Sequence, residues 1–209
     1  MNWKRFGLFS AIGIVYVWLI VHAGYVQDAG LAVAYGVPVF RIALAPHLNV
    51  LFNQAIFSLL IFNQSRISFY NQGILILTRH RSRVRLLVSV IRQCCGQIML
   101  LESLLLATNY LITQSFAIEY IPFALVQLLG LIISAIIQII VELKVGSTEA
   151  LAGVLLTLMM LEVCLPNSLQ IIHPCRMSMS ITAIIFLEII VGFFLTVIGA
   201  IVMSKQEVL

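Results

Sequence analysis

The chain has 209 residues, of which 62% are hydrophobic and only 10% are charged. A soluble globular domain is nearer half apolar and a quarter charged, so this composition excludes a soluble globular protein. The apolar residues come in long runs, and about 20 of them in a row suffice to cross roughly 30 Å of hydrocarbon as a helix. The composition therefore indicates an integral membrane protein, and the net charge of +4 gives no reason to expect nucleic-acid binding.

Six apolar runs predict an all-α, polytopic membrane protein with about six transmembrane helices in a single domain. The predicted helices cover residues 6–26, 48–62, 94–112, 121–141, 150–165 and 181–203. Pro38, Arg41 and Pro46 interrupt the apolar residues before the second helix. Because proline removes a backbone donor and restricts its predecessor, we end an external loop at Pro46 and expect a short second helix.

The basic residues predict the orientation of the chain in the membrane. Ten of them fall on one side of the predicted topology: Lys4, Arg5, Arg66, Arg79, Arg81, Arg83, Arg85, Arg92, Lys144 and Lys205. Arg41 and Arg176 fall on the other side. Since Lys and Arg accumulate in short cytoplasmic segments, we expect both termini in the cytoplasm and the first run to act as a signal anchor. The small residues at 21–23 would also suit a cleaved signal peptide.

The predicted cytoplasmic connection, residues 63–92, contains a dense basic cluster. Arg79, Arg81, Arg83 and Arg85 alternate with other residues, so they share one face of a strand or pair on two sides of a helix. One interpretation is a stop-transfer cluster on anionic lipid head groups, worth about 1 kcal/mol per base. The other is a docking element for a cytosolic partner, with these four arginines and Ser82 as contact residues.

The stretch Arg79-His80-Arg81-Ser82-Arg83, which follows an apolar run, resembles the connection between helices two and three in small six-helix permease subunits of bacterial ABC-2 type exporters. The aromatic residue that often follows in such subunits is replaced here by residues 84–86. The resemblance implies a coupling helix seated on a cytosolic ATPase subunit, a second membrane subunit, and a peptide or similar substrate. It also implies a bacterial plasma membrane.

Motifs of catalysis and nucleotide binding are missing from the sequence. It contains no G-x-x-x-x-G-K-[ST], H-E-x-x-H, G-x-S-x-G or C-x-x-C. We therefore expect no catalytic or metal-binding residues in this chain, and we place ATP and its hydrolysis on a partner subunit.

Three carboxylates lie within predicted helices, where a charge costs roughly 2.5 kcal/mol or more. Glu102 lies in the middle of the third helix, and Glu162 and Glu188 lie in the outer thirds of the fifth and sixth. They could form an intramembrane polar path or a proton-linked site. Alternatively, Glu162 and Glu188 reach the external interface, while Glu102 bonds a neighbour such as Asn109 or Gln97.

The four cysteines divide between the two sides of the membrane. Cys94 and Cys95 are adjacent at the inner end of the third helix, where we expect reduced packing residues or, in a eukaryote, palmitoylation sites. Cys164 and Cys175 fall on the outer side, and a disulfide closing their loop is geometrically open to them.

The sequence between the fourth and fifth helices predicts a tight helix hairpin. Glu142 and Lys144 flank the inner end of the fourth helix, and Gly146 can end it. Ser147 or Thr148 can then cap the next helix, with Glu149 near its positive end. A second local pattern is the spacing of small residues at 192, 196 and 200, which suits close helix packing within the chain or at a dimer seam.

Three functions are compatible with these patterns. The leading hypothesis is a permease subunit of an ATP-driven exporter, which pairs with a separate ATPase chain and a second membrane subunit. A second is a non-transporting membrane scaffold, immunity or assembly factor. A third is a secondary carrier or channel that uses the intramembrane carboxylates.

Overall fold

The computed structural model describes residues 3–22, 45–68, 83–113, 121–164 and 181–205. These segments are helical apart from short turns, and no strand occurs among them. The long helices of this part are α1 (Trp3–His22), α3 (Ala45–Ile61), α5 (Arg83–Thr113), α6 (Ile121–Lys144), α7 (Ser147–Cys164) and α8 (Ile181–Lys205). The predicted all-α class is thus confirmed for the residues described.

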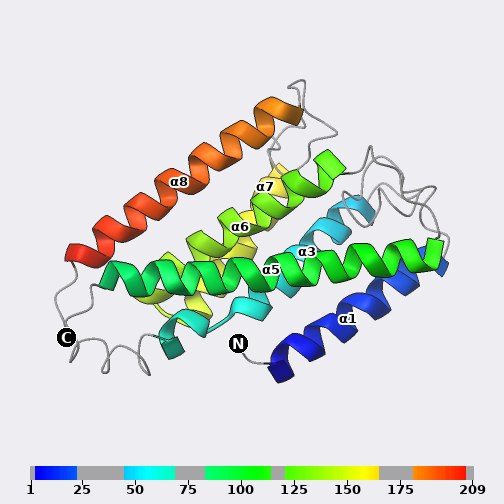
Figure 1. Ribbon diagram of the computed structural model, residues 1–209, viewed down its shortest axis with the longest axis horizontal. Helices are drawn as coiled ribbons and strands as arrows, with labels where there is room; N and C mark the ends of the chain where they lie inside the picture. The colour runs from blue at the N-terminus through cyan, green and yellow to red at the C-terminus, as the bar shows by residue number, and fades with distance from the viewer. Residues whose placement is uncertain (1–2, 23–44, 69–82, 114–120, 165–180, 206–209) are drawn as a thin grey trace.

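Successive helices run in opposite directions and form an up-and-down bundle (Figure 1). One end of the bundle, called the basic end below, holds the start of α1, residues 62–68, the start of α5, the turn between α6 and α7, and the end of α8. The Lys and Arg residues with described side chains all lie toward this end: Lys4, Arg5, Arg66, Arg85, Arg92 and Lys144. The charge asymmetry read along the sequence is therefore also an asymmetry in space.

Four of the described helices are long and apolar enough to cross a membrane. These spans lie in α1, α5, α6 and α8. The two remaining long helices are shorter, with 17 residues in α3 and 18 in α7. At 1.5 Å per residue they extend about 26–27 Å, slightly less than the hydrocarbon thickness. The described part is that of an integral multi-pass membrane protein.

Helix α5 begins at Arg83, well before the start at residue 94 that hydropathy predicts. Leu86, Leu87 and Val90 recur at helical spacing and are buried, whereas Arg85 and Arg92 are exposed. The arginines end the apolar run in the sequence, but they do not end the buried face of the helix. The last part of the predicted basic connection is therefore a helical extension of α5 rather than a separate loop.

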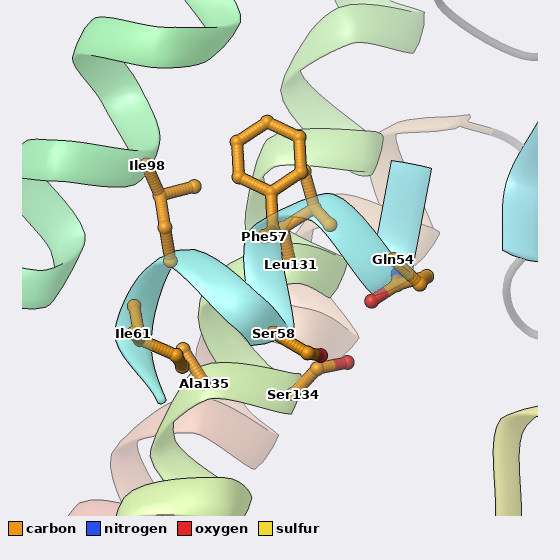
Figure 2. A pocket seen from close by; sticks show the side chains of 8 residues that line it. All are labelled: Gln54, Phe57, Ser58, Ile61, Ile98, Leu131, Ser134 and Ala135. Atoms are coloured by element: carbon orange, nitrogen blue, oxygen red, sulfur yellow. The ribbon is translucent and has the colours of Figure 1, made fainter. Parts of the chain in front are cut away.

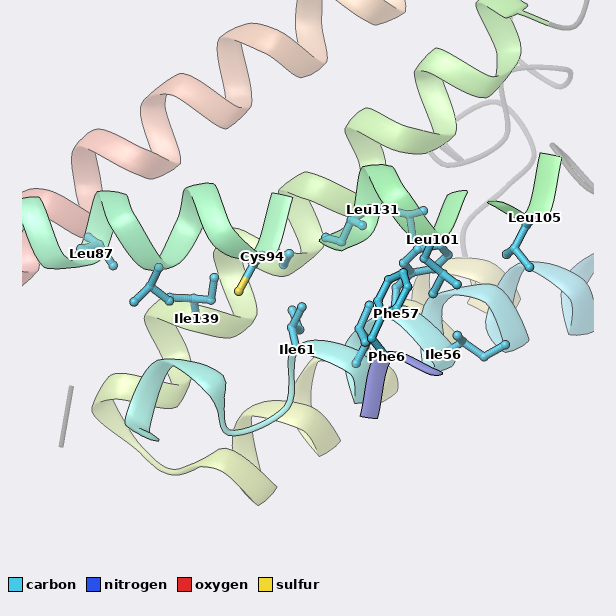
Figure 3. Packing of buried hydrophobic residues seen from close by; sticks show 14 of the residues in the cluster. Phe6, Ile56, Phe57, Ile61, Leu87, Cys94, Leu101, Leu105, Leu131 and Ile139 are labelled. Carbon is cyan, nitrogen blue, oxygen red and sulfur yellow. The ribbon is translucent and has the colours of Figure 1, made fainter. Parts of the chain in front are cut away.

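The core is built around α6, which packs against α3, α5, α7 and α8. Figure 3 shows Leu131 and Ile139 of this helix among buried residues of the neighbouring helices. Glycine permits a close approach at one contact, because a Cβ atom on Gly199 of α8 would lie 2.9 Å from Cδ1 of Ile140. Such small residues let membrane helices pack backbone against side chain.

The outward faces of α1 and α8 carry large apolar side chains. Trp18 and Leu19 of α1 are exposed, as are Phe186, Phe193 and Phe194 of α8. In a soluble protein an apolar surface of this kind would mark an interface. In a bilayer, lipid tails cover it, which agrees with the membrane-spanning character of these two helices.

Candidate functional site

The predicted docking residues lie around the start of α5. Arg79, Arg81 and Ser82 fall outside the described residues. Arg83 is the first residue of α5, and its side chain is not described. Arg85 follows with an exposed side chain, and Arg92 continues the basic surface two turns further along the helix.

The predicted intramembrane carboxylates are placed differently from one another. Glu102 and Glu188 are buried, and each has one carboxylate oxygen without a hydrogen-bond partner in the described part of the chain. Glu162 lies in α7, and its side chain is not described. Glu188 packs beside Gly130 of α6, where its Oε1 would lie 3.7 Å from an added Cβ.

The cysteine predictions are described only in part. Cys164 is the last residue of α7, and Cys175 lies outside the described residues, so their disulfide remains a prediction. Cys94 is buried and Cys95 half-buried, and both are free thiols. Cys94 packs in the core, as the packing interpretation expects.

The most extensive polar arrangement lies on α6, on a face that sequence reasoning did not single out. Ser134, Gln138 and Glu142 are spaced four residues apart and form one stripe, called the α6 polar stripe below. Gln138 is fully buried and Glu142 is 1% exposed. A carboxylate that is buried so completely must be bonded, neutral or paired with a cation.

The part of the α6 polar stripe farther from the basic end, at Ser134 and Gln138, faces α3. Ser134 and Ser58 line a narrow gap between α3, α5 and α6, together with Gln54 (Figure 2). The gap is too narrow to hold a water molecule. One turn closer to the basic end, Nε2 of Gln138 donates a 3.0 Å hydrogen bond to the backbone carbonyl of Ser58. This carbonyl is free for Gln138 because the amide of Phe62 bonds the carbonyl of Leu59 at 3.3 Å instead.

The part of the α6 polar stripe nearest the basic end, at Glu142, contacts residues 62–68. These residues, called the 62–68 segment below, form a turn and one short helical stretch after α3. The hydroxyl of Ser65, fully buried, donates a 2.5 Å hydrogen bond to Oε2 of Glu142. The neighbouring Gln64 donates from Nε2 to Oε1 of Gln97 on α5 at 2.7 Å. Consecutive residues of the segment are thus bonded to two different helices.

Side chains also satisfy the carbonyl groups at the end of α3. A guanidinium nitrogen of Arg5 on α1 donates to the carbonyl of Phe62, and Nε2 of Gln64 donates to the carbonyl of Leu60 at 2.8 Å. The last carbonyls of a helix have no partner within the helix, and leaving them unpaired inside a membrane protein is costly. The positive charge of Arg5 also suits the negative end of the helix dipole.

Asn63 makes the break between α3 and the following helical turn. Its φ of 62° is left-handed, the conformation that commonly ends a helix and that asparagine tolerates better than most residues. Its backbone carbonyl accepts the amide of Ile67 at 3.2 Å, which starts the next turn. Its side-chain Oδ1 accepts a 3.0 Å hydrogen bond from the hydroxyl of Ser147 at the start of α7. The 62–68 segment is therefore tied to α1, α5, α6 and α7.

The predicted hairpin between α6 and α7 is present, with α6 ending at Lys144 and α7 beginning at Ser147. The hydroxyl of Ser147, one of the two predicted caps, donates to Asn63, and Glu142 at the inner end of α6 is buried. Glu149 is exposed in the first turn of α7. A hydrogen bond from its own backbone amide, followed by one from the Thr148 hydroxyl, lowers the pKa of this carboxyl.

One sequence signal could have revealed the α6 polar stripe. Ser134, Gln138 and Glu142 are nearly the only polar residues in the inner half of an apolar helix, and they recur at the spacing of one helix face. The partner residues Ser65 and Gln64 gave no such signal, because their contacts to α5 and α6 join positions that are distant in the chain.

The bundle and its interior define a class of protein: an all-helical, multi-pass membrane protein with a buried polar cluster where the broken helix α3 meets α5, α6 and α7. No protein-family model, no curated protein and no solved structure matches the chain. Sequence and geometry alone therefore support the function proposed below.

Proposed function

We propose that this chain is the membrane-spanning subunit of an ATP-driven exporter, non-catalytic itself, that pairs with a cytosolic ATPase chain and a second membrane subunit. Its basic connection, which includes Arg79, Arg81, Ser82, Arg83 and Arg85, would bind the ATPase. The termini and the basic end would face the cytoplasm of a bacterial cell.

The observation that carries this proposal is the way both flanks of the basic connection join the bundle. On one side the 62–68 segment is bonded to α1, α5, α6 and α7. On the other side the connection continues into α5, a single helix of 31 residues. A displacement of the connection by a docked partner would thus reach α3 and α5 together, as coupling between an ATPase and a transport path requires.

The charge of the basic end supports a partner of acidic surface. Arg85 and Arg92 are exposed on the first turns of α5, and Lys144 is exposed at the end of α6. Exposed bases of this kind steer association with an acidic protein surface and also bind anionic lipid. Lipid contact alone would support the alternative of a scaffold or assembly factor, which needs an anchor but no ATPase.

The test is purification from the native membrane in mild detergent, followed by mass spectrometry of stoichiometric partners. A co-purifying chain with a phosphate-binding loop supports the exporter, and its loss in the triple variant Arg79→Ala, Arg81→Ala, Arg83→Ala places the docking site. The matched control is the variant Arg41→Ala, Arg176→Ala, which removes the two bases predicted on the opposite side and should keep the partner. Recovery of the wild-type chain without any ATPase would refute the proposal.

A secondary carrier is a second candidate, because Glu102 and Glu188 are buried and each keeps an oxygen without a hydrogen-bond partner in the described part of the chain. Groups of this kind often serve ion-linked transport. Flux into proteoliposomes that follows a proton gradient without ATP, and that is lost in Glu102→Gln, would favour the carrier. Flux that requires ATP and the partner chain would favour the exporter.

A further inference from the structure

Polar side chains line the contact between α3 and α6 inside an apolar bundle. On the α3 side they are Gln54, Ser58 and Ser65, and on the α6 side they are the residues of the α6 polar stripe. This contact is called the α3–α6 seam below. Gln54, Ser58 and Ser65 are each at most 5% exposed. Polar side chains are expensive within a membrane, and those that face a bundle interior commonly mark the path of a solute.

The α3–α6 seam lies among other helices. Helix α7 packs against both α3 and α6, and α5 packs against α6. Ile98 of α5 lines the same gap as Ser58 of α3 and Ser134 of α6 (Figure 2). Helices α5 and α7 therefore help to shield the polar groups from lipid, as a hydrophilic path through a membrane requires.

The hydrogen bonds along the seam are incomplete in this conformation. Oε1 of Gln54 and Oε1 of Gln138 have no hydrogen-bond partner among the described residues. The hydroxyl of Ser134 donates at 3.0 Å to the carbonyl of Gly130 in its own helix, so this bond does not cross the seam. Because an unpaired buried acceptor costs free energy, a seam that served stability alone would pair such groups. Water, or a solute with hydroxyl or amide donors, would satisfy both oxygens.

A gap in the seam gives the place for such an occupant. Gln54 lines it together with Ser58 and Ser134, and the Gln54 carboxamide extends toward the other lining side chains (Figure 2). None of the described residues that line the gap is charged. The lining therefore suits an uncharged hydrophilic solute. Since the gap is too narrow for a water molecule in this conformation, entry requires α3 and α6 to separate.

The 62–68 segment closes the seam at the basic end. Ser65 donates to Glu142 of α6 at 2.5 Å, and Ser147 at the start of α7 donates to Asn63 at 3.0 Å. The segment belongs to the start of the predicted connection, residues 63–92. A movement of the connection would therefore act on these bonds first, and their loss would open the seam toward the basic end.

We infer that the α3–α6 seam is the path of water and a small, uncharged hydrophilic solute through this chain, closed at the basic end by the 62–68 segment. It differs from the predicted polar path through Glu102, Glu162 and Glu188, which lie on α5, α7 and α8. In the exporter proposed above, a docked ATPase would move the 62–68 segment through the basic connection. The inference rests on that proposed function only for the driving force.

The test is the rate at which single cysteines react with hydroxyethyl methanethiosulfonate, an uncharged hydrophilic reagent, in permeabilised cells. The background lacks the four native cysteines, and the nearly isosteric variants Ser58→Cys and Ser134→Cys probe the seam. Matched controls on α6 are Ile136→Cys, which is buried outside the gap, and Ile137→Cys, which is exposed on the bundle surface. Both seam cysteines should react at least about tenfold faster than both controls, because a thiol must reach water to form the reactive thiolate.

The closing role of the 62–68 segment is tested by adding Ser65→Ala to Ser134→Cys. Loss of the bond to Glu142 should raise the labelling rate about fivefold, which corresponds to about 1 kcal/mol in the opening equilibrium. Ser103→Ala is the control, because the exposed Ser103 donates to the carbonyl of Met99 in its own helix. Equal rates with Ser65→Ala and Ser103→Ala would overturn the closure.

Hydroxyl-radical footprinting of the wild-type chain in native membranes gives a readout that needs no substitution. Leu131 lines the gap and Leu105 does not, although the two are 2% and 4% exposed. Water in the seam should make oxidation of Leu131 the faster of the two. Equal oxidation of the two leucines, or seam cysteines that react as slowly as Ile136→Cys, would overturn the path.

The path and the exporter fail separately in these experiments. Rapid labelling of the seam in a chain that co-purifies with no ATPase supports the path and refutes the exporter. A co-purifying ATPase together with a seam that labels no faster than the controls supports the exporter and refutes the path.

Discussion

The hydroxyl of Ser65 donates a 2.5 Å hydrogen bond to the buried carboxylate of Glu142, and this bond ties the first part of the predicted 63–92 connection to α6. Both side chains are almost fully buried, so water cannot replace the bond if it is lost. The relationship links the part of the chain that we propose binds a partner to the central helix of the bundle.

Ser65→Ala should destabilise the fold, because it leaves Oε2 of Glu142 without its donor. Hydrogen bonds between membrane helices are worth roughly 0.6–1.7 kcal/mol, so a loss of about 1 kcal/mol is expected. Reversible unfolding in mixed micelles measures it. Ser103→Ala is the control, because the exposed Ser103 donates to the carbonyl of Met99 in its own helix. Equal stability of Ser65→Ala and Ser103→Ala would contradict the role of this bond.

Gln138→Leu should lower stability by about 1–3 kcal/mol, because the carbonyl of Ser58 loses its donor within the bundle. Gln127→Leu is the matched control on the same helix, since Gln127 is half-buried and lies away from this carbonyl. Thermal unfolding of both variants in nanodiscs gives the comparison. A Gln138→Leu protein as stable as Gln127→Leu would show that α3 satisfies this carbonyl in another way.

Gly199→Val should separate α8 from α6 and destabilise the bundle by about 1–3 kcal/mol. A Cβ at Gly199 would lie 2.9 Å from Cδ1 and 3.1 Å from Cγ1 of Ile140, so the larger side chain cannot fit without movement. Gly153→Val is the control, because nothing lies within 4 Å of a Cβ at that position. The measurement is again the unfolding midpoint, and a similar midpoint for both variants would count against the close packing.

Glu149 should make a small pH-dependent contribution at the start of α7. Because folding lowers the pKa of this carboxyl from its ordinary 4.5, the contribution is present above that value and is lost as the pH falls through the folded pKa. The midpoint of the wild type should therefore exceed that of Glu149→Gln at neutral pH, and the difference should shrink on acidification. A difference that is independent of pH would exclude a charge effect.

The orientation of the basic end can be measured by cysteine labelling in a background without the four native cysteines. Thr148→Cys, which is exposed at the basic end, should react with a membrane-impermeant maleimide only after the cells are permeabilised. Asp28→Cys, on the predicted outer side, should react in intact cells. Labelling of Thr148→Cys in intact cells would reverse the predicted topology.

Local patterns in the sequence were sufficient for the class and for most of the helices. The start of α6 at residue 121 and of α8 at residue 181 agree with the predicted starts, because each follows a polar stretch and begins a long apolar run. The start of α5 was missed because exposed Arg85 and Arg92 end the apolar run while the buried face continues. Hydropathy averages all faces of a helix, whereas packing depends on one face.

The candidate site was predicted only in part for a similar reason. Burial of Glu102 and Glu188 agrees with their places within apolar runs. Glu142 was placed at the inner end of the fourth helix, where α6 ends, but nothing in the sequence indicated that Ser65 and the surrounding core enclose it. Sequence position gives depth along a helix, but it does not tell which side chain from a distant segment covers that position.

By itself, the sequence determined the all-helical, membrane-spanning character of the described residues and the position of their basic side chains toward one end of the bundle, because hydrophobicity and charge act on each segment independently. Only the tertiary structure decided that the 62–68 segment is bonded to α1, α5, α6 and α7, and that the α6 polar stripe is buried. Those outcomes depend on hydrogen bonds between residues far apart in the chain, which form only after the helices have packed.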